Sequence, residues 1–200
     1  MNGSELLAVR GLSKAFGEHQ VLAGLDLSFA AGSVTALTGP NGSGKSTLLR
    51  CLAGATPVDR GDVLLDGAVC DPTSPEHWGA VLGILDDHAW LPGLTVRDHL
   101  LLVGDDVDHA LDRIGLAGLG DRRAPSLSSG QRQRAALAIT LVRPWRVLLL
   151  DEPERHLDDE GVDLLVDLVA GWRDRTVVFA THSAELVDRT GAARVTLDAV

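Results

Sequence analysis

The sequence is poor in cysteine, in cationic runs and in long apolar runs, and each shortage excludes a class of protein. Its two cysteines, Cys51 and Cys70, lie far apart and match no metal-binding spacing. Such sparse cysteine usage is typical of a reduced cytosolic compartment. The formal net charge is −10, and no dense run of lysine and arginine is present to neutralise nucleic-acid phosphates. We therefore expect neither a cysteine-based metal site nor a nucleic-acid partner.

We also expect neither a targeting segment nor a membrane-spanning segment in this sequence. The longest apolar stretches, such as residues 100–103 and 147–150, are far too short to cross a bilayer. Residues 1–7 contain no basic segment followed by an apolar run, so we expect no signal peptide. A chain of 200 residues fits one domain that can bury a core. We therefore expect a single domain over residues 1–200, with any membrane role mediated by a partner protein.

What the chain does contain is a glycine-rich segment with the pattern Gly, four residues, Gly-Lys-Ser. An apolar run at 34–37 predicts a buried strand before it, and a helix is expected over about residues 44–53. Glycines let backbone amides approach an anion, and the helix dipole attracts the same charge. The segment predicts a phosphate-binding loop, with Lys45 on the outer phosphates and Ser46 on a magnesium ion. Its members are Gly39, Pro40, Asn41, Gly42, Ser43, Gly44, Lys45, Ser46 and Thr47.

Two further predicted strands end in residues that suit phosphate chemistry. Asp151 and Glu152 follow one apolar run, and His182 follows the next. Ligands of open α/β sheets bind beyond the carboxyl ends of the strands, so these side chains are expected beside the phosphate loop. Asp151 would hold Mg²⁺, partly through water, and Glu152 could deprotonate an attacking water. His182 is a candidate for contacting the transferred phosphoryl group, which makes Lys45, Glu152 and His182 the predicted catalytic residues.

The remaining pattern predicts an α/β fold with two additions. Residues 6–10 and 21–29 have strand-like apolar content and indicate an N-terminal antiparallel sheet. Residues 95–118 change to helical spacing, which predicts a small helical subdomain of about residues 92–128. The expected fold class is a P-loop NTPase core, a mostly parallel sheet with flanking helices, plus an antiparallel β-subdomain and the helical subdomain.

A second motif precedes the Asp-Glu strand. Residues 127–131 read Leu-Ser-Ser-Gly-Gln, which resembles the signature Leu-Ser-Gly-Gly-Gln of the nucleotide-binding domains of ABC transporters. The resemblance extends over about residues 6–197. It implies an ATPase that uses ATP and Mg²⁺ and pairs head to tail with a second ATP-binding subunit, each nucleotide lying between one phosphate loop and the other subunit's signature. Its residues Ser128, Ser129, Gly130 and Gln131 would then serve the second subunit's nucleotide at a helix start.

The resemblance also implies roles for single residues. Phe16 matches the aromatic residue that stacks on adenine, although an ordinary core aromatic is the alternative. Glu152 matches the catalytic base and His182 the switch histidine. Ser129 departs from the family pattern because it replaces the first signature glycine, which is a mild change.

Two other departures concern loops. Residues 154–156, Glu-Arg-His, replace small polar residues, which puts the contacts of this loop in doubt. The glutamine that follows the fourth strand is replaced by an acid, Asp86, with Asp87 as the one-residue alternative. As a carboxylate it would be a further magnesium ligand. Trp90, close beyond it, is either an anchor for a membrane partner or a packing residue of the helical subdomain.

The combined expectation is an ATP-hydrolysing subunit on the cytoplasmic face of a membrane, bound to a transmembrane permease subunit. Its second ATP-binding subunit would be an identical chain or a close relative. The compact length without a C-terminal regulatory domain favours a bacterial exporter. The alternatives are an ABC-type ATPase of DNA repair or translation, which the lack of long insertions disfavours, and a slow nucleotide switch, which the intact Lys45, Asp151, Glu152 and His182 disfavour.

Overall fold

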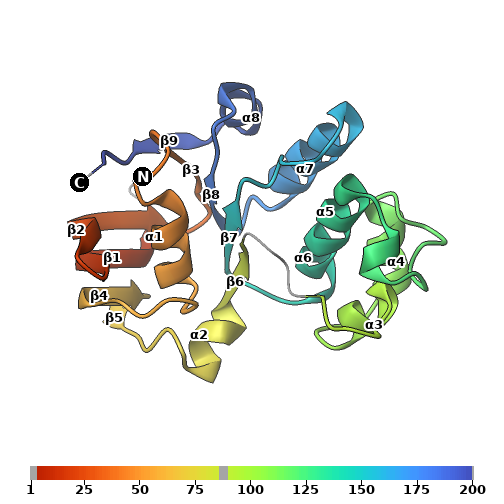
Figure 1. The fold of residues 1–200 in the computed structure, drawn as a ribbon, viewed down its shortest axis with the longest axis horizontal. Helices are drawn as coiled ribbons and strands as arrows, with labels where there is room; N and C mark the ends of the chain where they lie inside the picture. The colour runs from red at the N-terminus through yellow and green to blue at the C-terminus, as the bar shows by residue number, and fades with distance from the viewer. Residues whose placement is uncertain (1–3, 86–89, 200) are drawn as a thin grey trace.

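The computed structural model describes residues 4–85 and 90–199, and its frame consists of two sheets (Figure 1). The first is antiparallel, in the order β2-β1-β4-β5. A turn at Gly17 joins β1 and β2 as a hairpin in which Phe16 pairs with His19. These two strands are longer than predicted, but the expected N-terminal antiparallel sheet is present. Its strands are β1 (Glu5–Phe16), β2 (His19–Ala30), β4 (Arg60–Leu65) and β5 (Ala68–Val69).

The second sheet is parallel throughout, in the order β6-β7-β8-β3-β9. Every residue of β7 and β8 is buried, which explains why their sequences are continuous apolar runs rather than alternating ones. Because β7, β8 and β3 are neighbours, their carboxyl ends meet at one edge. The strands are β3 (Val34–Thr38), β6 (Val81–Ile84), β7 (Val147–Asp151), β8 (Thr176–Ala180) and β9 (Ala193–Thr196).

Helices cover both faces of the parallel sheet. Helix α1 (Lys45–Leu52) packs in one apolar cluster with β1, β3 and β7, so it lies between the two sheets (Figure 1). Helices α7 (Asp159–Gly171) and α8 (Ala184–Thr190) share another cluster with the opposite face. This is the fold predicted from the sequence, a P-loop core with an added antiparallel sheet, and the prediction of the fold class is confirmed.

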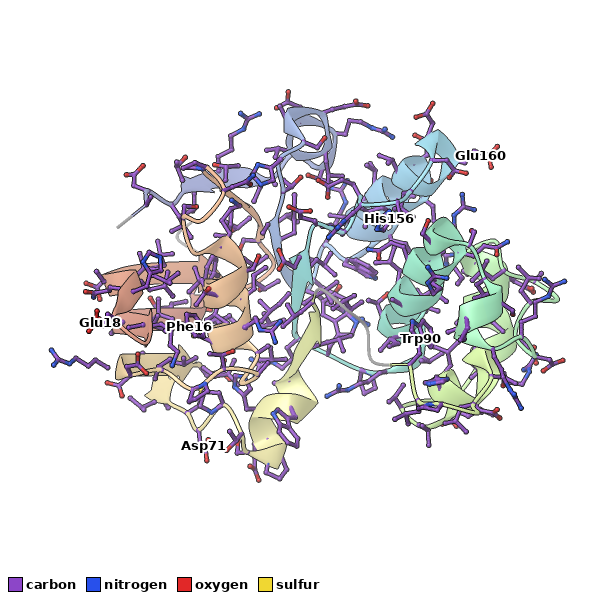
Figure 2. The ribbon with its side chains drawn as sticks, viewed as in Figure 1. Phe16, Glu18, Asp71, Trp90, His156 and Glu160 are labelled. Atoms are coloured by element: carbon purple, nitrogen blue, oxygen red, sulfur yellow. The ribbon has the colours of Figure 1, made fainter. Side chains whose placement is uncertain are left out.

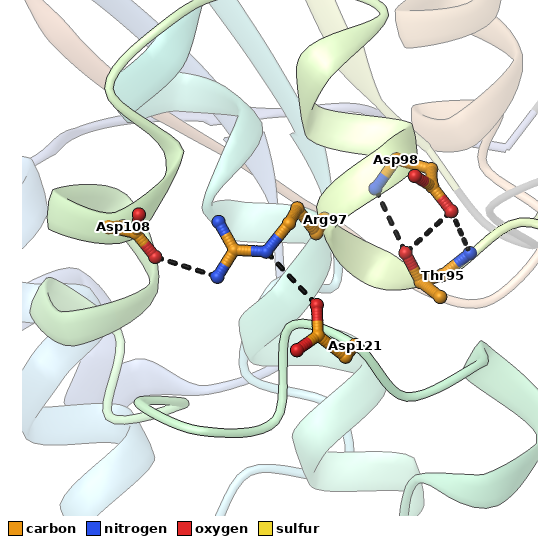
Figure 3. Close-up of polar contacts among 5 residues, drawn as sticks. All are labelled: Thr95, Arg97, Asp98, Asp108 and Asp121. Carbon is orange, nitrogen blue, oxygen red and sulfur yellow. Dashed lines mark hydrogen bonds and ion pairs between the residues drawn. The ribbon is translucent and has the colours of Figure 1, made fainter.

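Four helices gather at the other end of the molecule (Figure 1): α3 (Val96–Leu101), α4 (Val107–Arg113), α5 (Ser129–Leu137) and α6 (Ile139–Val142). They share an apolar cluster of their own, which also includes Leu127. Figure 3 shows how Arg97 ties this region together, since it bonds Asp108 at 2.7 Å and Asp121 at 3.1 Å. The predicted limits of this subdomain, about residues 92–128, remain a prediction.

Three local features were not predicted from the sequence. Helix α2 (Pro75–Ala80) forms where the Ser74 hydroxyl caps its first turn and Pro75 suits that turn. The helical segment after Ser128 is divided at Ala138 into α5 and α6. A 3-10 helix (Ala124–Ser126) precedes α5. Over the described ranges, no helix has the length and apolarity needed to span a membrane.

Candidate functional site

The glycine-rich loop between β3 and α1 takes a conformation that other residues cannot adopt. Gly39 has φ 135° and Gly44 has φ 90°. A Cβ at Gly39 would lie 2.2 Å from the Leu197 carbonyl oxygen, and one at Gly44 would lie 2.6 Å from Leu22. Gly44 is also the N-cap of α1, where no side chain accepts a bond from the first turn. The loop therefore leads into a helix whose N-terminal amides have no side-chain cap and are available to an anion.

Two polar side chains of the loop are buried in a way that suits an anionic ligand. The Lys45 ammonium, on a residue 7 % exposed, donates to the carbonyl oxygens of Gly39 at 2.9 Å and Pro40 at 3.0 Å. The Ser43 hydroxyl is buried and, among the described residues, has no hydrogen-bond partner. An unsatisfied buried hydroxyl is costly, so a ligand that bonds it would be favoured. The residues present thus fit a phosphate group.

One cavity of about 310 Å³ joins the loop to residues from three other segments. Lys45 and Ser46 line it from α1, Glu152 and His182 line it from the ends of β7 and β8, and Phe16 lines it from the end of β1. The structure thereby brings together the predicted phosphate loop, two predicted catalytic side chains and the predicted adenine-stacking residue. A cavity of this composition has room for phosphates at one part and an aromatic surface at another.

Phe16 does not behave as a core aromatic. Its side chain is 54 % exposed at the β1–β2 hairpin, close to α1 (Figure 2). The ammonium of Lys14 lies 5.4 Å from the ring centroid and pairs with Asp59 at 2.8 Å. The cation contacts part of the ring, and the exposure of Phe16 leaves the rest of the aromatic surface available for stacking on a base.

The acidic pair after β7 is held at the sheet edge by the backbone. Asp151 is the last residue of β7 and only 6 % exposed. Glu152 has φ 45°, a strained value for this residue type, and its amide donates to the Ala180 carbonyl at 3.0 Å. Its carboxylate then lies 3.6 Å from His182 Nε2. Backbone strain of this kind concentrates at functional sites, where it fixes a side chain in one direction.

Oxygen atoms that suit Mg²⁺ as ligands lie at this edge of the parallel sheet. Ser46 offers a hydroxyl to the cavity, and Asp151 offers a carboxylate at the same edge. Within the described ranges, no three His, Cys, Asp or Glu side chains form a metal-binding group. An ion at this site would therefore keep several waters and use few protein ligands, as Mg²⁺ commonly does. The predicted ligand Asp86 and its alternative Asp87 lie outside the described residues.

The signature segment lies elsewhere. Among the described residues that line the cavity, none belongs to 128–131. Ser128 caps α5: its hydroxyl accepts from the Gln131 amide at 3.1 Å, and the Gln131 side chain accepts from the Ser128 amide at 3.0 Å. Gly130 faces the loop after β7, since a Cβ there would lie 2.8 Å from the His156 carbonyl oxygen. Figure 2 shows His156 between α5 and α7.

Sequence reasoning missed three side chains near the cavity. His19 lines it, and its pairing with Phe16 across the hairpin could have suggested this. The Thr181 hydroxyl donates to the Glu154 carboxylate. Burial raises the pKa of Glu154, and the neighbouring charge of Glu152 adds to the effect. The only sequence signal for Glu154 was its replacement of a small polar residue.

Trp90 is partly buried and packs against the apolar cluster of the helical region. Its ring meets that of His99 edge to face, with centroids 4.9 Å apart, and Figure 2 shows it on the side of the helices. His99 in turn bonds the backbone at Leu91 and Thr95. Of the two roles considered for Trp90, the contacts favour packing within the helical region.

Comparisons with known proteins agree on one family. A family model described as ABC transporter matches residues 22–155. The sulfate/thiosulfate import ATP-binding protein CysA of Thermosynechococcus vestitus is 38% identical over 194 residues, which are 90% of this chain and 57% of that protein. The spermidine/putrescine import ATP-binding protein PotA of Chromobacterium violaceum is 35% identical over 88% of this chain and 53% of its own length. The chain thus spans little more than half the length of these relatives.

Solved structures show the same fold. A dimeric bacterial ABC transporter cassette superposes with a TM-score of 0.86, covering 96% of this chain and 94% of that one at 20% sequence identity. At this identity the likeness supports the fold alone, and it agrees with the fold class read from the two sheets.

Proposed function

The chain belongs to the ABC transporter family, and we propose that it is the ATP-binding and ATP-hydrolysing subunit that powers a membrane transporter. The family predicted from the sequence is confirmed, and membership of that family supports the predicted ATPase class. The observation that carries the proposal is the single cavity shared by Phe16, the phosphate loop, Glu152 and His182.

Six side chains in or beside the cavity have a part in the proposed reaction. The ring of Phe16 stacks on the adenine, and the amides of the loop, with Lys45, hold the phosphates. Ser46 and Asp151 would hold Mg²⁺, which would supply positive charge to the phosphates. Glu152 orients a water and takes its proton, and His182, 3.6 Å away, contacts the transferred phosphoryl group.

A second ATP-binding subunit is proposed to complete the site. The chain does not place residues 128–131 on its own cavity, as far as the described residues show. We propose that the signature of one subunit, with Ser128, Ser129, Gly130 and Gln131, meets the nucleotide of the other in a head-to-tail dimer. Cassette dimers are known among proteins of this fold.

A transmembrane permease subunit is the proposed membrane partner, which would hold the chain at the cytoplasmic face. The surface that supports this lies beyond the Asp86 position. Leu91, Leu101 and Leu102 are each more than half exposed at the helical end of the molecule. Because contiguous exposed apolar patches mark sites of protein–protein contact, we propose that this part of the helical region faces the permease. Coupling through Asp86 itself remains a prediction.

The direction of transport differs from the sequence-based expectation. The compact length favoured an exporter, yet both curated relatives named above are import proteins. Because those relatives are longer than this chain, its length is not a guide to direction. We propose that the cassette serves import, and uptake of a labelled solute into vesicles bearing the assembled transporter tests the direction.

The test of the ATPase itself uses Glu152→Gln, which keeps the shape of the side chain but removes the base. Steady-state ATP turnover should fall by about 10²- to 10⁴-fold, while ATP binding persists and a dimer accumulates in size-exclusion chromatography with ATP. Glu160→Gln, an exposed acid in the first turn of α7, is the matched control and should behave as wild type. Full turnover by Glu152→Gln would exclude the assigned base.

A further inference from the structure

The residues on both sides of His182 are fixed by one hydroxyl. Thr181 is 1 % exposed, and its hydroxyl oxygen accepts from the Ser183 amide at 2.9 Å. The same hydroxyl donates to Oε1 of Glu154. The two residues that flank His182, Thr181 and Ser183, are therefore hydrogen-bonded to each other. The hydroxyl that joins them also donates a hydrogen bond to Glu154.

The surrounding backbone anchors the loop that carries His182 on both sides. The Thr181 amide donates to the Leu37 carbonyl of β3 at 3.2 Å, and the Ser183 hydroxyl caps α8 through the Leu186 amide at 3.1 Å. The loop is thus anchored to the sheet before His182 and to a helix after it. Between these anchors, the Glu154 carboxylate accepts the hydrogen bond that the Thr181 hydroxyl donates.

Stability alone does not explain a carboxyl group at position 154. Its second oxygen, Oε2, is buried and has no hydrogen-bond partner among the described residues. Burial disfavours the charged form and raises the pKa of Glu154, and the charge of Glu152 acts in the same sense. A buried carboxyl with an unsatisfied oxygen destabilises the fold. A functional role would account for its presence.

We propose that Glu154 is a positioning residue for His182, acting through the Thr181 hydroxyl to hold the imidazole against Glu152 and the phosphoryl group. This inference rests on the proposed ATPase function. It assigns a role to the Glu-Arg-His segment that departs from the family pattern, and it places that role outside direct contact with the nucleotide.

The kinetic test compares the two partners of the bond. Glu154→Ala and Thr181→Val, which is isosteric but lacks the hydroxyl, should each lower kcat for ATP about ten- to a hundredfold, with KM and ATP affinity unchanged. Thr181→Ser and Glu154→Gln, which keep a donor and an acceptor, should restore much of the rate. The double variant Glu154→Ala/Thr181→Val should be no slower than Thr181→Val alone, since Thr181→Val already breaks the bond to Glu154. Glu160→Ala is the control.

A second measurement does not need ATPase activity. Hydrogen–deuterium exchange of residues 181–183 in the nucleotide-free chain should become faster in Glu154→Ala and Thr181→Val, and should stay at the wild-type rate in Glu160→Ala. Unchanged exchange in Glu154→Ala overturns the inference even if the wild-type chain proves inactive, an outcome that would separately contradict the proposed function. In an active wild type, a Glu154→Ala variant that loses thermal stability but keeps its kcat also overturns it.

Discussion

Two helices of this chain begin in serine- and glycine-rich segments, and their N-termini are built in opposite ways. Helix α1 begins after Gly44, which has φ 90° and offers no side-chain cap. Helix α5 begins after Ser128, whose hydroxyl bonds the Gln131 amide while the Gln131 side chain bonds back. The first helix start is open, and the second is closed by its own residues.

The difference separates two proposed half-sites, one with an uncapped helix start and one whose helix start is capped by its own side chains. At α1, an anion would satisfy amides and the buried Ser43 hydroxyl that the described protein leaves unbonded. At α5, the Gln131 amide already bonds the Ser128 hydroxyl, so a ligand that accepts from this amide must replace the capping bond. We therefore expect the single chain to bind nucleotide through α1, and the signature to act only when a second subunit supplies a phosphate.

The largest expected effect is at the open helix. Lys45→Ala removes the charge that faces the phosphates, and ATP affinity should fall by about a hundredfold. Isothermal titration calorimetry with Mg-ATP measures this. Arg50→Ala, an exposed cation in the last turn of the same helix, is the control and should bind ATP normally. An unchanged affinity in Lys45→Ala would remove the phosphate loop from the site.

The next test asks whether the closed helix works across two subunits. Ser128→Arg blocks the signature and Lys45→Ala blocks the phosphate loop, so each variant alone should be inactive. In a mixture, heterodimers carry one site with both lesions and one site with neither, so ATPase activity should return. If heterodimers form but no activity returns, each site is complete within one chain.

Much of the open site could be predicted because its signals are local. The spacing of glycines and Lys45 describes the loop, and the apolar runs before Asp151 and His182 give the strands whose ends meet. The start of the closed helix also has a local signal, because Ser128 with Gln131 three residues later is the capping-box pattern.

The parts that sequence could not predict depend on tertiary contacts. Glu154 and Thr181 are 27 residues apart and meet only because β7 and β8 are neighbours in the sheet. The exposure of Phe16 depends on where the hairpin ends relative to α1. Helix α2 was missed although Ser74-Pro75 is a helix-start signal, because its six residues are too few to show helical periodicity.

A smaller effect concerns the stability of the closed helix in the free chain. Ser128→Ala removes the hydroxyl that caps α5, and the free energy of unfolding should fall by about 1 kcal/mol. Urea denaturation without nucleotide measures the change. Ser129→Ala replaces the neighbouring serine, which lies inside the helix, and should leave stability almost unchanged. Equal losses in both variants would show that the cap does not hold this helix.

The smallest expected effect is a change in the free energy of unfolding that is caused by the Glu154 carboxyl, and this change depends on pH. Burial raises the pKa of Glu154 in the folded chain above its value in the unfolded chain, so between these two values the folded state binds the proton more strongly. The stability that this group contributes is therefore complete below the unfolded pKa and is lost as the pH rises through the folded pKa.

Glu154→Gln does not titrate, so its free energy of unfolding relative to wild type should increase with pH, with the variant the more stable of the two at neutral pH. Urea denaturation across the acidic to neutral range tests this, with Glu160→Gln as the pH-independent control. A difference that stays constant or shrinks as the pH rises would mean that the Glu154 carboxyl is solvated, and that the destabilisation argued for its buried oxygen does not exist.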